Sequence, residues 1–73
     1  MSEIVKNKLA ERLLVLRNEN GLTQRELAEK LNINSVTYLH YEKGQREPPL
    51  DLLLKISYFY SVSLDFLIGK TDY

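Results

Sequence analysis

Residues 22–48, LTQRELAEKLNINSVTYLHYEKGQREP, contain the signals for two short helices joined by a tight turn. Thr23 and Glu26 have the spacing of a capping box, which predicts that a helix begins there. Asn34 is a favoured N-cap, so a second helix is expected to begin directly after it. Because only three residues separate the two helical patterns, the stretch predicts a helix-turn-helix over about 23–43.

Helical signals continue on both sides of this stretch. Leucines at helical spacing predict a helix over about 5–19, and a similar apolar pattern predicts another over about 50–60. Ser63 is the expected N-cap of a last, short helix. The sequence therefore predicts an all-α chain of five helices, folded as a single helix-turn-helix domain over residues 1–73.

The composition limits the class of protein. The 73 residues include no cysteine, so the fold cannot depend on disulfides. Ten basic residues balance ten acidic ones, which does not favour non-specific binding to polyanions. No apolar run approaches the roughly 20 residues of a membrane span, and the polar start MSEIVKNK does not resemble a signal peptide. We expect a cytoplasmic protein that does not bind membranes.

The second predicted helix carries apolar residues on two faces. Tyr38 and Tyr41 are neighbours on one face, whereas Val36 and Leu39 lie on the opposite face. The tyrosines have the larger area, so we expect them to enter the core. The opposite orientation, with Val36 and Leu39 in the core, remains open at this stage. If these two side chains face outward, they can contact thymine methyl groups in a DNA major groove, which predicts A·T-rich half-sites.

The central stretch resembles the DNA-binding core of the phage-repressor and Cro-like (XRE-type) helix-turn-helix family. The residues that carry the resemblance are Thr23-Gln24, Leu27-Ala28, Leu31, Ile33, Tyr41-Glu42, Gly44 and Pro48. Residues 53–72, LLKISYFYSVSLDFLIGKTD, resemble the last two helices of the same family. The resemblance implies a compact five-helix, lambda-repressor-like domain that binds double-stranded DNA.

The resemblance also assigns roles to individual residues. The residues expected to read bases in the major groove are Ser35, Val36, Thr37, Leu39 and His40. The residues expected to contact phosphate are Thr23, Gln24, Arg25, Lys43 and Arg46. Free amides at a helix N-terminus bind anions, which independently supports phosphate contacts near Thr23. Arg17 and Glu42 match a structural ion pair of the family.

Other chemistry finds little support in the sequence. His40 is the only histidine and there is no cysteine, so no metal site is expected. No nucleophile–base set or glycine-rich phosphate loop can be recognised, so we expect neither an enzyme nor a cofactor.

The resemblance implies a homodimer, and surplus apolar residues suggest where it forms. Phe66, Leu52 and Tyr58 are the first candidates for the dimer surface, followed by Leu14 and Val15. The leading hypothesis is a sequence-specific transcriptional regulator, a repressor that binds a pseudo-palindromic operator as a homodimer. The alternative is a protein-interaction module on the same fold, such as an antitoxin or an anti-repressor partner, which the neutral charge favours.

Overall fold

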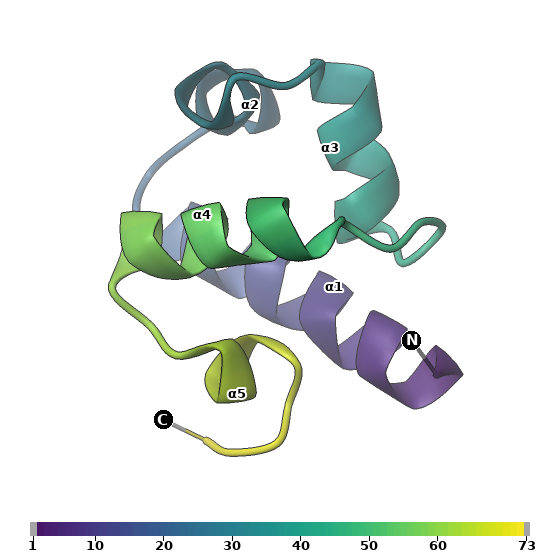
Figure 1. Ribbon diagram of the computed structural model, residues 1–73. Coiled ribbons are helices and arrows are strands. Elements are labelled where there is room, and N and C mark those ends of the chain that lie inside the picture. The colour runs from purple at the N-terminus through teal and green to yellow at the C-terminus, as the bar shows by residue number, and fades with distance from the viewer. Residues whose placement is uncertain (1, 73) are drawn as a thin grey trace.

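Five helices make up the computed structural model, which describes residues 2–72 (Figure 1). They are α1 (Glu3–Glu19), α2 (Gln24–Leu31), α3 (Ser35–Glu42), α4 (Leu50–Tyr60) and α5 (Leu64–Leu67). No strand occurs within residues 2–72, which confirms the predicted all-α fold. α1 begins two residues earlier than expected because the Ser2 hydroxyl accepts a hydrogen bond from the Val5 amide at 3.2 Å.

The caps around the turn between α2 and α3 are those that the sequence predicts. The Thr23 hydroxyl accepts from the Glu26 amide at 3.0 Å, and the Glu26 carboxylate accepts from the Thr23 amide at 2.9 Å. Asn34 caps α3 by accepting from the Val36 amide at 2.7 Å. Asn32 ends α2 in the left-handed conformation, with φ of 59°, which turns the chain toward α3. Local hydrogen bonds therefore determine the residues at which α2 and α3 begin.

One core joins all five helices. Its buried members are Leu9, Leu13, Leu16, Leu27, Ala28, Leu31, Tyr38, Tyr41, Leu52, Leu53, Ile56 and Leu67. Leu52 is only 8% exposed, so the prediction that it belongs to a dimer surface is wrong. The buried face of α4 is wider than a single stripe, because Leu52 lies beside Leu53 and both face the core.

The α2–α3 pair and α5 lie at opposite sides of the molecule, with α1 and α4 between them (Figure 1). The Lys55 ammonium group on α4 donates to the carbonyl oxygen of Leu31 at 2.7 Å, which joins α4 to the C-terminal end of α2. This arrangement leaves the outer face of the α2–α3 pair uncovered. None of the helices between residues 2 and 72 has the length and apolar character needed to cross a bilayer.

Candidate nucleic-acid interface

The orientation of α3 decides which side chains it presents. Tyr38 is fully buried and Tyr41 is 8% exposed, whereas Val36 is 59% exposed on the opposite face. Leu39 and His40 are half-buried beside Val36. The tyrosines are therefore in the core, as expected, and the opposite orientation of α3 is wrong.

The five residues expected to read bases lie along α3 but differ in exposure. Ser35 and Val36 are exposed in the first turn, and Thr37 is half-buried. Leu39 and His40 follow one turn later, again half-buried. The accessible surface of α3 is thus greatest at its N-terminal end, where the exposed Ser35 hydroxyl lies beside the apolar side chain of Val36.

The N-terminal end of α2 holds three of the expected phosphate contacts. The hydroxyl and the amide of Thr23 are both used in the capping box with Glu26. The side chain of Gln24 is turned toward α3, and its Nε2 donates to Glu42 Oε1 at 3.4 Å. Arg25 is exposed and lies 3.7 Å from Glu29, a spacing that makes a weak surface pair. Arg25 is therefore the most accessible cation at this end of α2.

The loop after α3 holds the other two expected phosphate contacts. Lys43 is the C-cap of α3 and Arg46 lies in the following loop, and both are exposed. Neither forms an ion pair with another residue of the range 2–72. Gly44, with φ of 71°, reverses the chain between them. Two exposed cations, with no ion-pair partner in the described part of the chain, thus lie beside the C-terminal end of α3.

An ion pair beneath this surface joins α3 to α1. Arg17 Nε donates to Glu42 Oε2 at 2.9 Å, and Nη2 donates to Oε1 at 2.7 Å. Arg17 Nη1 also donates to the carbonyl oxygen of Leu22 at 2.9 Å. The two side chains are only 13% and 4% exposed, so the geometry is that of a buried, bidentate pair. The expected pair between Arg17 and Glu42 is therefore present.

The ion pair changes the titration of the groups around it. Burial raises the pKa of Glu42, but the hydrogen bonds and charge of Arg17 outweigh this effect, and the pKa lies below its ordinary value. Burial and the Glu42 carboxylate raise the pKa of Tyr38 well above its ordinary value. Burial also raises the pKa of Tyr60, to about 12. The Tyr38 hydroxyl lies against the Glu42 carboxylate, whereas the buried Tyr60 hydroxyl has no hydrogen-bond partner within residues 2–72.

A side-chain contact at the end of α3 was not foreseen from the sequence. His40 Nδ1 lies 2.7 Å from Gln45 Oε1 in the loop. The five-residue spacing across a glycine is the signal that could have suggested it. No three side chains among residues 2–72 that could ligate a metal lie together.

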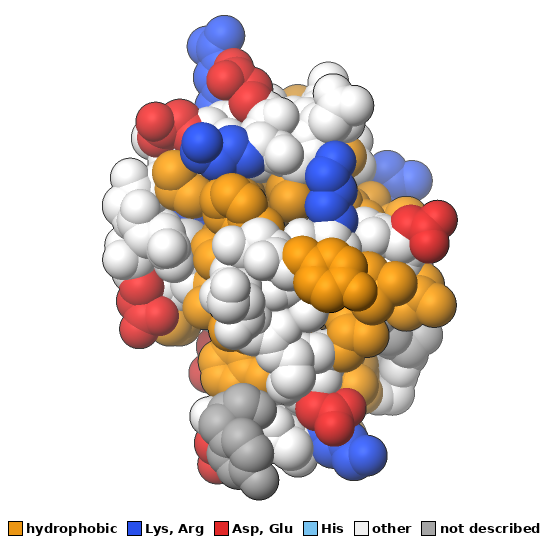
Figure 2. All heavy atoms as spheres, turned by 60° about the vertical axis from the view of Figure 1, so that its left-hand side comes forward, with side chains coloured by type: hydrophobic (Ala, Val, Ile, Leu, Met, Phe, Trp, Pro, Cys, Tyr) orange, Lys and Arg blue, Asp and Glu red, His pale blue; other side chains and the backbone are white. Residues whose placement is uncertain are grey.

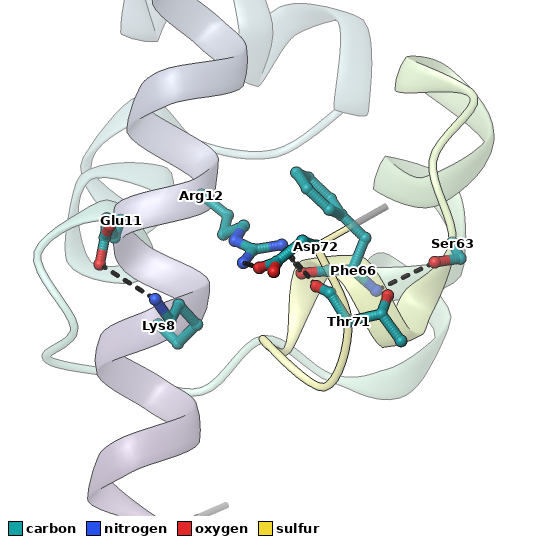
Figure 3. Close-up of polar contacts among 7 residues, drawn as sticks. All are labelled: Lys8, Glu11, Arg12, Ser63, Phe66, Thr71 and Asp72. Atoms are coloured by element: carbon teal, nitrogen blue, oxygen red, sulfur yellow. Dashed lines mark hydrogen bonds and ion pairs between the residues drawn. The ribbon is translucent and has the colours of Figure 1, made fainter.

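The candidate dimer residues have different surroundings. The Arg12 guanidinium lies 4.1 Å from the centre of the Phe66 ring, and Arg12 also donates to the Phe66 and Thr71 carbonyl oxygens at 2.9 Å (Figure 3). The Phe66 side chain is therefore half-buried, with Arg12 against one face of its ring. Tyr58, in contrast, is 79% exposed.

An apolar stripe runs along the outer face of α4. Leu50, Leu54 and Tyr58 recur at four-residue spacing, and the first and last of them are strongly exposed. Figure 2 brings the C-terminal end of α4 toward the viewer and shows apolar side chains gathered on this side. Leu14 and Val15 on α1 are also partly exposed, as expected.

The chain is similar in sequence to known helix-turn-helix proteins. A sequence profile of the helix-turn-helix family HTH_3 matches residues 13–67. The chain is 47% identical to the transcriptional regulator ImmR of Bacillus subtilis over 64 residues, which cover 88% of this chain and 50% of ImmR. It is 37% identical to the phage transcriptional repressor RstR of Vibrio cholerae over 57 residues, which cover 78% of this chain and 51% of RstR. Both names are those of regulators rather than enzymes.

A solved structure shows the same fold. The crystal structure of a transcriptional regulator from Listeria innocua matches with a TM-score of 0.80 and 33% identity, covering 84% of this chain and 57% of that protein. The chain spans about half the length of the two curated relatives described above. With the two capped helices, the three-residue turn and the matched profile together, the chain belongs to the helix-turn-helix family.

Proposed function

We propose that the chain is the sequence-specific DNA-binding unit of a transcriptional regulator. The observation that carries this proposal is the orientation of α3: its tyrosines face the core, and its opposite face lies uncovered beside Lys43 and Arg46, two exposed cations that pair with no residue of the range 2–72. A helix exposed in this way can enter the major groove of double-stranded DNA. The roles of ImmR and RstR as transcriptional regulators support this proposal.

The two helices contact different parts of the DNA. The exposed residues of α3 read base edges, and those at its N-terminal end enter the groove first. These residues are Ser35, Val36, Thr37, Leu39 and His40. The N-terminal end of α2 and the loop after α3 contact phosphates, which fixes the register on the duplex. These residues are Thr23, Gln24, Arg25, Lys43 and Arg46.

We infer that the regulator is a repressor that binds a pseudo-palindromic operator as a homodimer. The stripe formed by Leu50, Leu54 and Tyr58 supports self-association, because a two-fold axis can place such a stripe against its own copy. Two subunits also double the few phosphate contacts that one neutral chain can make. The two α3 helices would then lie about 34 Å apart, one turn of DNA. Replacing Tyr58 with Ser should shift the chain toward monomer in sedimentation velocity.

The test is selection of binding sites from random duplexes, followed by a salt series on the selected site. We expect a sequence with two-fold symmetry and a linear fall of log affinity with log salt. Lys43→Ala should reduce the slope by about one, as the loss of one phosphate contact requires. Lys70→Ala is the control, because this exposed lysine lies beyond α5.

A reporter gene under the selected operator tests the sign of regulation. A repressor lowers expression from a promoter that contains this operator, and raised expression would contradict repression while leaving DNA binding intact.

The second candidate function is a protein-interaction module, such as an antitoxin or an anti-repressor partner. The neutral net charge and the apolar residues Val36 and Leu39 on the outer face of α3 favour it. The same salt series separates the two functions. Absence of binding to any duplex at low salt would support the protein partner and contradict the DNA-binding proposal.

A further inference from the structure

His40 and Gln45 are joined twice at the C-terminal end of α3. The backbone N–H of Gln45 donates to the backbone carbonyl oxygen of His40 at 2.9 Å, and Gly44 provides the left-handed turn between the two residues. The side chains then meet at 2.7 Å, between His40 Nδ1 and Gln45 Oε1. The backbone bond and the side-chain bond together hold the imidazole ring in one position.

This contact determines which ring nitrogen carries the proton. A carboxamide oxygen can only accept a hydrogen bond, so Nδ1 must be the donor. A neutral imidazole has a single N–H group. In the neutral ring, the nitrogen without a proton is therefore Nε2 of His40, which acts as a hydrogen-bond acceptor.

The acceptor nitrogen is available on the candidate DNA-binding face. No residue of the range 2–72 provides a hydrogen bond to Nε2, and the ring is only half-buried. His40 lies one turn after Val36 and one turn before Lys43, on the same side of α3. Nothing else on this side of α3 offers an aromatic nitrogen acceptor, because His40 is the only histidine.

We propose that Gln45 fixes the Nδ1–H tautomer of His40, and that His40 thereby selects a base with an amino group in the major groove. Adenine N6 and cytosine N4 are donors there, whereas guanine O6 and thymine O4 are acceptors. His40 thus prefers adenine or cytosine over guanine or thymine at one position of each half-site. This inference rests on the proposed function, since it requires that α3 enters the groove. Gln45 is a positioning residue, because it acts only through the ring.

The first measurement needs no DNA. Long-range proton–nitrogen NMR spectra of the uniformly ¹⁵N-labelled protein, recorded at pH 8, report one imidazole because the chain has one histidine. We expect the Nδ1–H pattern in the unmodified protein and in Gln45→Glu, whose carboxylate keeps an acceptor at the same place. Gln45→Leu removes the acceptor and should show loss of that pattern. An Nε2–H pattern in the unmodified protein would overturn the assigned tautomer.

The second measurement is site selection at the same pH with the unmodified protein, His40→Ala and Gln45→Leu. We expect about a two- to tenfold preference for adenine or cytosine at one position, as one neutral hydrogen bond provides. His40→Ala should abolish this preference alone, and Gln45→Leu should abolish it or shift it toward guanine or thymine. Specific binding in which no position responds to His40→Ala would overturn the reading role. Failure to bind any duplex would overturn both that role and the proposed function, while the NMR spectra still decide the tautomer.

Discussion

Arg17 on α1 binds the carboxylate of Glu42 at the end of α3 through two hydrogen bonds of 2.9 and 2.7 Å. Both side chains are almost completely buried, so solvent screens the pair very little. Glu42 also accepts from Gln24 on α2 at 3.4 Å. One carboxylate therefore links three helices and fixes the angle at which α3 leaves the core.

Replacing Glu42 with Gln should lower the free energy of unfolding by about 3 kcal/mol, because the Arg17 charge is left buried without its partner. Urea unfolding followed by circular dichroism at pH 7 measures the change. Glu29→Gln is the control, since it breaks only the exposed pair with Arg25 and should cost less than about 0.5 kcal/mol. Equal losses in the two variants would show that the buried pair contributes no more to the free energy of unfolding than the exposed pair does.

The same pair predicts how stability depends on pH. The pKa of Glu42 lies below its ordinary value in the folded chain, so its contribution is complete above the unfolded pKa of about 4.3. It is lost as the pH falls through the folded pKa. The unmodified protein should therefore lose stability in acid faster than Glu42→Gln, and the difference between the two should end once the pH lies below the folded pKa of Glu42. Glu26, whose pKa is also lowered, is present in both proteins. Parallel pH profiles would contradict this prediction.

Tyr60→Phe should leave the free energy of unfolding unchanged or raise it by up to about 1 kcal/mol. The reason is that the Tyr60 hydroxyl is buried and accepts or donates no hydrogen bond within residues 2–72, so its removal loses no hydrogen bond and ends a desolvation cost. Tyr58→Phe, at an exposed position, is the control and should change nothing. A loss of more than about 1 kcal/mol in Tyr60→Phe would mean that the hydroxyl has a partner in solution.

Two glycines offer a comparison of backbone strain with steric conflict. Gly21 and Gly69 both have positive φ, 65° and 83°. A Cβ on Gly21 meets nothing within 4 Å, whereas a Cβ on Gly69 would fall against Cγ and Cβ of Lys8 on α1 (Figure 3 shows Lys8). Gly21→Ala should therefore cost about 1 kcal/mol, and Gly69→Ala at least about 1 kcal/mol more. Thermal unfolding of both variants measures this, and equal costs would contradict close packing of Gly69 on α1.

Local hydrogen bonds explain why so much of the fold could be predicted. The caps at Thr23 and Asn34 involve residues two or three positions apart, so their residue types alone identify the helix ends. The core face of α3 followed from the area of Tyr38 and Tyr41. The tight turn between α2 and α3 could be predicted because only three residues separate the two helical patterns.

Features that depend on distant packing could not be predicted in the same way. Leu52 was misplaced because the width of the buried face of α4 depends on the helices that pack against it. The contact of Arg12 with the Phe66 ring joins residues 54 positions apart, so no local pattern indicates it, and the role of Phe66 in a dimer stays a prediction. The pair between Arg17 and Glu42 followed from the family resemblance, since their separation has no local signature. The contact between His40 and Gln45 is local but needs the backbone turn at Gly44 to be seen.

Under the proposed function, Val36 on α3 contacts a thymine methyl group in the major groove. Its side chain is 59% exposed in the first turn of α3, the part that enters the major groove first under the proposed function. An apolar side chain there gains from contact with the thymine methyl group and offers nothing to a cytosine in its place. Val36→Ala should therefore reduce the preference for thymine at one position of each half-site by about 1 kcal/mol, measured by competition between duplexes that carry thymine or uracil there. Ile4→Ala, which truncates an aliphatic side chain on α1 that is 81% exposed and has no proposed role, should leave the preference unchanged. If thymine and uracil duplexes bind the unmodified protein equally at every position, the outer face of α3 does not read methyl groups.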